Sequence, residues 1–194
     1  MIMYRKQMKL QKVLCLALLV LCALIFLYSL GIMTDLYDSL FSTIRRGKTS
    51  VDGAEVYMDM QGFDRDFLHG SIALIVLCLG LFITGTSSRR KYYIGNYASV
   101  LLFSAGGTAL AVWVHGKIEE FKAQFLTIDF EALAEHAAKR KTLYTESTFW
   151  FDIHYLVFAL LLIGIILLIA NAVWKSKLMK EEQALIAQGK EAAA

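Results

Sequence analysis

Two long uncharged runs separated by a short basic turn constrain the fold most strongly. Residues 71–86 carry no charged side chain, and neither do residues 92–114, while the turn between them (SSRRK, 87–91) holds three successive cations. An α-helix rises about 1.5 Å per residue, so about 20 residues cross the roughly 30 Å hydrocarbon core of a bilayer. The pattern therefore predicts an antiparallel hairpin of two transmembrane helices whose turn lies in the cytoplasm.

The rest of the chain extends this hairpin into a larger membrane domain. Uncharged runs at residues 13–33 and 154–174 flank it, and 57% of the 194 residues are hydrophobic. A soluble domain of this size does not need so high an apolar fraction. We predict an all-α integral membrane protein, a four-transmembrane-helix antiparallel bundle with helical extracytoplasmic extensions.

The boundaries of the segments follow from the same runs. We expect transmembrane helices at residues 13–33, 71–86, 92–115 and 154–174, the first continuing to about residue 46 and the third to about residue 126. The remaining segments are a basic cytoplasmic N-terminus (1–12), an outer loop (34–70), the cytoplasmic turn (87–91), a second outer loop (116–153) with an amphipathic helix at 129–141, and a cytoplasmic helical tail (175–194).

The charge distribution predicts the orientation. The two termini and the 87–91 turn together hold 11 Lys and Arg against three acids, whereas the two outer loops hold nine against 14. Because cytoplasmic segments are enriched in Lys and Arg, both termini are expected in the cytoplasm and the protein in the plasma membrane. The outer loops contain neither cysteine nor an N-x-S/T sequon, which favours a bacterial origin.

Small side chains predict where the helices pack against each other. Lipid removes most of the hydrophobic drive between membrane helices, so close contacts of small residues must hold them together. The expected seam joins the second and third helices and comprises Gly80, Thr84, Ser104, Gly106, Gly107, Thr108 and Ala111.

Histidines at the outer helix ends are the best candidates for chemistry. His69 begins the second helix, His115 ends the third and His154 begins the fourth, with Asp66 and Asp152 close to two of them. Three imidazoles and a carboxylate could bind Zn²⁺ or Cu²⁺, and a ring of titratable groups could sense pH. The ordinary alternative is that these histidines are wetted residues of the membrane boundary, and on that alternative we predict no bound metal or other cofactor.

Polar residues at the inner boundary have a simpler interpretation. Asn96 and Asn171 are expected to form hydrogen bonds at the membrane interface, and Trp174 with Lys175 to mark the exit of the fourth helix.

The function predicted from these patterns is contact rather than catalysis. The sequence contains no G-x-S-x-G, H-E-x-x-H or P-loop motif, and no charged residue lies inside the four expected spans. We predict a non-catalytic accessory, assembly or stabilising subunit of a larger membrane complex such as a transporter. Its partners would be the bilayer and other subunits, which would contact the transmembrane faces, outer helices and tail; no nucleic acid is expected. The alternative is a small channel, carrier or membrane sensor that uses the outer His/Asp cluster.

Overall fold

The computed structural model describes residues 2–34, 51–86, 93–140 and 144–191. These residues form five α-helices and, within the described ranges, no strand: α1 (Ile2–Thr34), α3 (Val56–Thr86), α4 (Tyr93–Phe125), α5 (Phe130–Arg140) and α6 (Phe149–Glu191). All except α5 are long and apolar enough to cross a membrane. The protein is therefore all-helical in its described part, with four candidate membrane spans.

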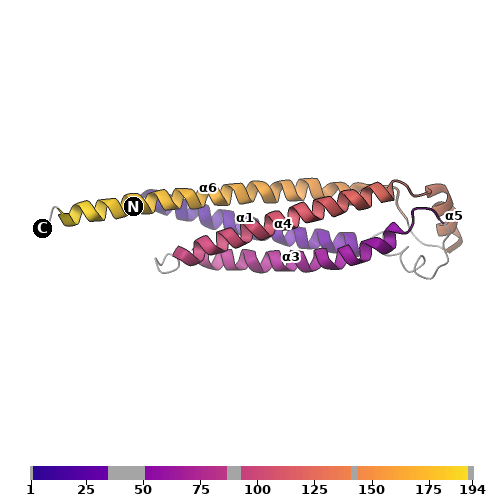
Figure 1. The fold of residues 1–194 in the computed structure, drawn as a ribbon, viewed down its shortest axis with the longest axis horizontal. Helices are drawn as coiled ribbons and strands as arrows, with labels where there is room; N and C mark the ends of the chain where they lie inside the picture. The colour runs from indigo at the N-terminus through magenta and orange to yellow at the C-terminus, as the bar shows by residue number, and fades with distance from the viewer. Residues whose placement is uncertain (1, 35–50, 87–92, 141–143, 192–194) are drawn as a thin grey trace.

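The four long helices lie side by side along one axis (Figure 1). α1 packs on α3 and α6, and α4 packs on the same two helices, so the four close into one assembly. Both chain termini lie at one end, which we call the terminal end, and α5 lies at the other, the α5 end (Figure 1). The last part of α6 projects past α3 and α4 at the terminal end, where it has no neighbouring helix in the figure.

The helices are longer than the apolar runs that predict them. α3 begins at Val56, well inside the expected outer loop, and α6 continues without a break through the expected tail. α5 occupies the expected amphipathic segment, and Asp129 caps it because its Oδ1 accepts a hydrogen bond from the Ala132 N–H at 3.0 Å. The predicted continuation of the first helix to about residue 46 falls outside the described residues.

Each long helix buries one stripe and exposes the rest. On α6 the buried stripe follows helical spacing, with Phe158, Leu161, Ile165 and Leu168 between 0 and 4% exposed. The outward faces are apolar too; Ile166, for example, is 64% exposed. A helix that is apolar on all sides is typical of a bilayer environment, and these faces are compatible with contact to lipid.

Gly106 and Gly107 of α4 lie at close helix contacts with different neighbours. A Cβ atom at Gly106 would lie 2.9 Å from Leu77 Cδ1 of α3, and one at Gly107 would lie 3.0 Å from Ile165 Cδ1 of α6. Ala111 is also buried, at 3% exposure. The small residues of α4 therefore bring it close to two helices rather than to α3 alone.

The predicted packing roles of Gly80 and Thr108 were wrong. A Cβ atom at Gly80 would meet nothing within 4 Å, and Thr108 is exposed. Thr84 does face α4, because a Cβ atom at Gly95 would lie 3.9 Å from its methyl carbon Cγ2, while its hydroxyl donates to the Gly80 carbonyl of its own helix at 2.9 Å. The reason is rotational: α3 meets α4 with the face that carries Leu74 and Leu77, and Gly80 lies at the flank of that face.

Candidate functional site

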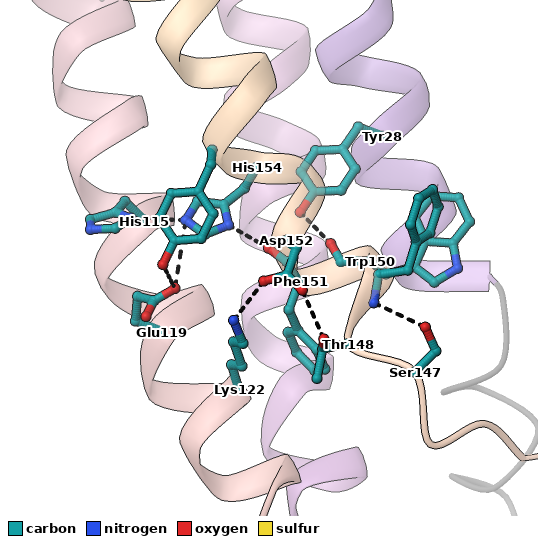
Figure 2. A network of polar contacts seen from close by, with 12 residues as sticks. Tyr28, His115, Glu119, Lys122, Ser147, Thr148, Trp150, Phe151, Asp152 and His154 are labelled. Atoms are coloured by element: carbon teal, nitrogen blue, oxygen red, sulfur yellow. Dashed lines mark hydrogen bonds and ion pairs between the residues drawn. The ribbon is translucent and has the colours of Figure 1, made fainter.

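Two helices bring three potential metal ligands together at the α5 end. His115 and Glu119 lie one turn apart on α4, a spacing that places both side chains on one face, and His154 projects from α6. One ligand atom of each lies within 4.8 Å of the other two. In the described part of the chain no other group of three His, Cys, Asp or Glu side chains meets this criterion. We call these three residues the ligand cluster; Figure 2 shows them converging.

His154 belongs to the buried stripe of α6. It lies three residues after Phe151 and four before Phe158, both buried, and it is itself 1% exposed. The start of α6 is fixed against α1, because the Tyr28 hydroxyl donates a 2.7 Å hydrogen bond to the Trp150 carbonyl (Figure 2). The imidazole is thus held by the packing of the helix that carries it and does not depend on a flexible loop.

Hydrogen bonds define which nitrogen of His154 carries its proton. Nδ1 of His154 contacts the Phe151 carbonyl oxygen, which can only accept, so Nδ1 carries the hydrogen of the neutral ring. Nε2 is then the acceptor, and it lies 2.8 Å from Nδ1 of His115, which donates to it. A metal-binding histidine characteristically donates its other ring N–H to a carbonyl or carboxylate in this way. His154 is therefore already in the tautomer that presents a lone pair to the cluster.

Glu119 supplies the negative charge. Its Oε1 accepts a 2.6 Å hydrogen bond from the Tyr155 hydroxyl and lies 3.8 Å from His154 Nε2 (Figure 2). The Glu119 side chain is 40% exposed, so an ion could reach the carboxylate from solvent. The cluster accordingly combines a buried imidazole, an exposed imidazole and a partly exposed carboxylate.

These distances suit a small divalent transition-metal ion. Zn²⁺ binds His nitrogen and carboxylate oxygen at about 2.0–2.2 Å, so ligand atoms in a tetrahedral site lie roughly 3.3–3.6 Å apart. The observed separations of 2.8 and 3.8 Å lie on either side of that range, and small side-chain shifts would equalise them. Three protein ligands would leave a fourth position for water.

Asp152, expected to be a ligand, has other partners. Its Oδ1 forms a 2.5 Å ion pair with Lys122 Nζ, and its Oδ2 accepts a 2.7 Å hydrogen bond from the Thr148 hydroxyl (Figure 2). Lys122 lies one turn after Glu119 on α4 and so faces the first turn of α6. The prediction that Asp152 joins the histidines is corrected: it ties α4 to α6 beside the ligand cluster.

His69 and Asp66 do not join the cluster. α3 buries the stripe that contains Phe63 and Phe67, and the two candidate ligands are exposed and lie outside that stripe. Asp66 pairs with its neighbour Arg65 at 3.7 Å. All three histidines were expected at the outer ends of their helices, which suggested a ring. That shared position does not determine the direction in which each side chain points.

Sequence reasoning missed Glu119, although a signal was present. Glu119 is four positions after His115, and side chains at i and i+4 lie on one face of a helix, as two ligands of one ion must. A His–His pair at that spacing, the more familiar signature of a metal site on a helix, does not occur in the chain.

A second polar cluster lies at the terminal end. It is made of amides and one lysine from α1, α4 and α6, all between 0 and 5% exposed: Gln7, Gln11, Asn96, Asn171 and Lys175. Gln7 Nε2 donates to Gln11 Oε1 at 3.0 Å and to Asn171 Oδ1 at 3.3 Å. Asn96 Oδ1 accepts from Gln11 Nε2 at 3.2 Å and from Lys175 Nζ at 2.9 Å. We call this group the amide cluster.

The amide cluster corrects the interpretation of Lys175. The residue was expected to mark the exit of the fourth helix, but its ammonium group is buried between helices and hydrogen-bonded to Asn96. Asn171 and Lys175 lie one turn apart, as do Gln7 and Gln11, so the two polar side chains of each pair lie on the same buried face of their helix. Asn96 likewise bonds to other helices rather than to solvent.

Comparison with known proteins adds no assignment to this geometry. No family model matches the sequence, and neither curated proteins nor solved structures give a significant match. The functional conclusion therefore rests on the geometry of the two clusters.

Proposed function

We propose that this chain is a multi-pass membrane protein that binds a divalent transition-metal ion of the Zn²⁺ class at the α5 end and acts as a metal-responsive sensor. The observation that carries the proposal is the ligand cluster, in which His115, Glu119 and His154 bring three ligand atoms within 4.8 Å of one another. A His₂Glu set with an open fourth position suits this class of ion. The proposal adopts the sensor alternative of the sequence analysis, with Glu119 in place of aspartate.

The binding step requires one change of tautomer. His154 already presents Nε2, because its Nδ1 hydrogen is engaged by the Phe151 carbonyl. His115 must move its proton from Nδ1 to Nε2, which leaves the Nδ1 lone pair free for the ion. The ion then replaces the hydrogen bond between the rings and joins α4 to α6 more strongly. This new link between two helices is the signal that a sensor would transmit.

The proposed placement is a four-helix antiparallel bundle in the bacterial plasma membrane, with both termini in the cytoplasm. The positive-inside rule supports it, because exposed cations gather at the terminal end of the described structure. These are Arg5, Lys6, Lys9 and Lys12 on α1 and Lys177 and Lys180 on α6. The ligand cluster would then lie at the extracytoplasmic face of the plasma membrane, where metal ions outside the cytoplasm could reach it.

The test is Zn²⁺ binding to the purified full-length protein in mild detergent, produced without a polyhistidine tag. We expect one equivalent of Zn²⁺ by isothermal titration calorimetry and elemental analysis. Glu119→Gln and His115→Gln should each weaken binding at least about tenfold, because each removes one ligand. Co²⁺ in place of Zn²⁺ should give the absorption of a tetrahedral ion.

Two matched variants keep this test specific. His69→Gln removes an exposed histidine of α3 at the same end, and Glu120→Gln removes the carboxylate next to Glu119, which pairs with Lys117 at 2.7 Å. Both should bind Zn²⁺ like the unaltered protein. Absence of stoichiometric Zn²⁺, or equal loss in the control variants, would exclude the proposed site. If only the pH dependence of stability responds to the cluster variants, the natural ligand is a proton.

The second candidate function is an accessory subunit that acts by contact with another protein. The end of α6 supports it, because this helix projects past α3 and α4 (Figure 1), and its residues Leu185 and Ile186 are 68 and 45% exposed. Exposed apolar side chains on a helix that extends from the membrane domain suit a partner helix.

A mild-detergent pull-down with quantitative mass spectrometry tests this candidate. A specific partner should co-purify stoichiometrically with the unaltered chain and disappear with Leu185→Glu/Ile186→Glu. The double variant Gln183→Glu/Gln188→Glu adds the same charge to exposed positions of the tail and should retain the partner. Recovery of the chain alone would contradict a tail-mediated contact, and equal loss in both variants would contradict a contact made by the apolar side chains.

A further inference from the structure

A groove between α4 and α6 at the terminal end has an apolar wall and a basic rim. It has a volume of about 530 Å³, and its apolar part is formed by Val100, Leu101, Ile169 and Val173. Lys177 and Lys180 line the same groove further along α6. The lining spans 12 residues of α6, from Ile169 to Lys180, and therefore about 16 Å along the helix axis.

The polar groups of the groove are arranged at two depths. Both lysines are exposed at the rim, and Ser176 accompanies them. Deeper in the groove, the hydroxyl of Ser104 is buried and has no hydrogen-bond partner in the described part of the chain. A buried hydroxyl without a partner is unfavourable, so an acceptor in the groove would stabilise it.

The wall of the groove is held together by a bond between its two helices. The Tyr97 hydroxyl donates to the Ala172 carbonyl at 3.0 Å, and both residues line the groove. The concave surface is therefore fixed by the packing of α4 on α6. No acidic residue is among the residues that line it, although Glu181 and Glu182 follow directly in the tail.

We propose that this groove binds one anionic phospholipid of the cytoplasmic leaflet, with its phosphate at Lys177 and Lys180 and an acyl chain along Val100, Leu101 and Val173. Charge complementarity selects this occupant: an apolar peptide would not need the lysines, and a soluble phosphate would not need the apolar wall. Basic pockets between membrane helices on the cytoplasmic side bind anionic headgroups for the same reason. The inference uses the proposed membrane placement but is independent of the metal site.

The test is native mass spectrometry of the full chain in mild detergent with added phosphatidylglycerol or phosphatidylcholine of the same acyl chains. We expect one retained phosphatidylglycerol and much weaker retention of phosphatidylcholine. Lys177→Gln/Lys180→Gln should lower phosphatidylglycerol affinity about 30-fold, since each lysine near an anionic surface contributes roughly fivefold. Val173→Trp should fill the apolar part of the groove and lower the affinity for both lipids.

The control is Lys6→Gln/Lys9→Gln, which removes two exposed cations at the same end but outside the groove. This variant should retain the lipid with less than about a twofold change, because surface charge outside the groove acts only through a screened field. Equal losses in the two lysine variants would mean that the lipid is held by general charge attraction and would overturn the proposal. Equal retention of both lipids by the unaltered protein would overturn it too.

Discussion

The two polar clusters of this protein, both of which lie between apolar helices, differ in burial and in hydrogen bonding. At the terminal end, four amides and Lys175 are at most 5% exposed, and a chain of hydrogen bonds joins three helices. At the α5 end, His115 is exposed, Glu119 is 40% exposed in its side chain, and only His154 is buried.

The chemistry of the two clusters assigns a different role to each end. Amides do not titrate and bind metal ions poorly, so the amide cluster is suited to fixing the register of α1, α4 and α6. Imidazoles and a carboxylate change protonation and bind transition metals, and their exposure lets a ligand enter. We therefore infer a structural terminal end and a responsive α5 end.

The largest effect is expected from Asn96→Leu. This change removes the oxygen that accepts from both Gln11 and Lys175, and it leaves a buried ammonium without that acceptor. Loss of the hydrogen-bond acceptor of a buried charged group costs about 1.5–3 kcal/mol of unfolding free energy. The measurement is thermal unfolding in detergent followed with a thiol-reactive dye, since Cys15, Cys22 and Cys78 are free and buried.

The double variant Asn96→Leu/Lys175→Met provides the control. It removes the ammonium together with its acceptor, so more than half of the lost stability should return. If the double variant is as unstable as the single one, Lys175 is not the source of the loss, and the amide cluster does not hold the helices as inferred.

The next effect is the pH dependence of Zn²⁺ binding, which is expected only at the α5 end because the amides of the other cluster do not titrate. Protons compete with a metal ion for the ring nitrogens of His115 and His154, so Zn²⁺ affinity should fall as the solution becomes more acidic. Between about pH 7.5 and about pH 5.5 we expect a loss of at least tenfold by calorimetry. Affinity that does not change over this range would mean that carboxylates alone hold the ion and would remove the histidines from the site.

A smaller effect is expected from Tyr155→Phe. The tyrosine hydroxyl orients Glu119 through a 2.6 Å hydrogen bond, and loss of such a second partner typically weakens metal binding about tenfold. Tyr144→Phe removes a hydroxyl from a residue outside the ligand cluster and should leave Zn²⁺ affinity unchanged. Unchanged affinity in Tyr155→Phe would show that Glu119 is oriented by other contacts.

The smallest effect is expected at the Lys122–Asp152 ion pair. The two side chains are 23 and 45% exposed, and pairs of this kind contribute about 0.2–1 kcal/mol. A double-mutant cycle with Lys122→Met and Asp152→Asn should give a coupling energy in that range, reduced by high salt. A coupling above about 2 kcal/mol would mean that the pair is an essential tie between α4 and α6.

Periodicity and apolar runs predicted the long helices because both are local properties of the chain. The runs at 71–86 and 154–174 lie inside α3 and α6, and α5 (Phe130–Arg140) lies within the amphipathic helix expected at 129–141. The helical tail predicted from residue 175 onward is present as the end of α6, which runs to Glu191. The early start of α3 at Val56 was not predicted, because polar residues outside a membrane are equally compatible with a loop or with a continued helix.

The candidate site could be predicted only in part. Sequence position placed His115 and His154 at the same end of neighbouring helices, and His115 Nδ1 does lie 2.8 Å from His154 Nε2. It could not exclude His69, because the rotation of α3 about its axis depends on which of its faces packs against the other helices. Nor could it separate Asp152 from the cluster, since Lys122 comes from a different helix.

The amino-acid sequence is sufficient to predict long apolar helices and to name the residues that can titrate near their ends. Which of those residues meet depends on the packed bundle, because helix rotation and register are set by side-chain packing between segments far apart in the chain. Lys175 illustrates the distinction: as part of a linear sequence it resembles a boundary cation, yet packing of α6 against α1 and α4 buries it among amides. Glu119 became a ligand candidate for the same reason, when α6 brought His154 to its side.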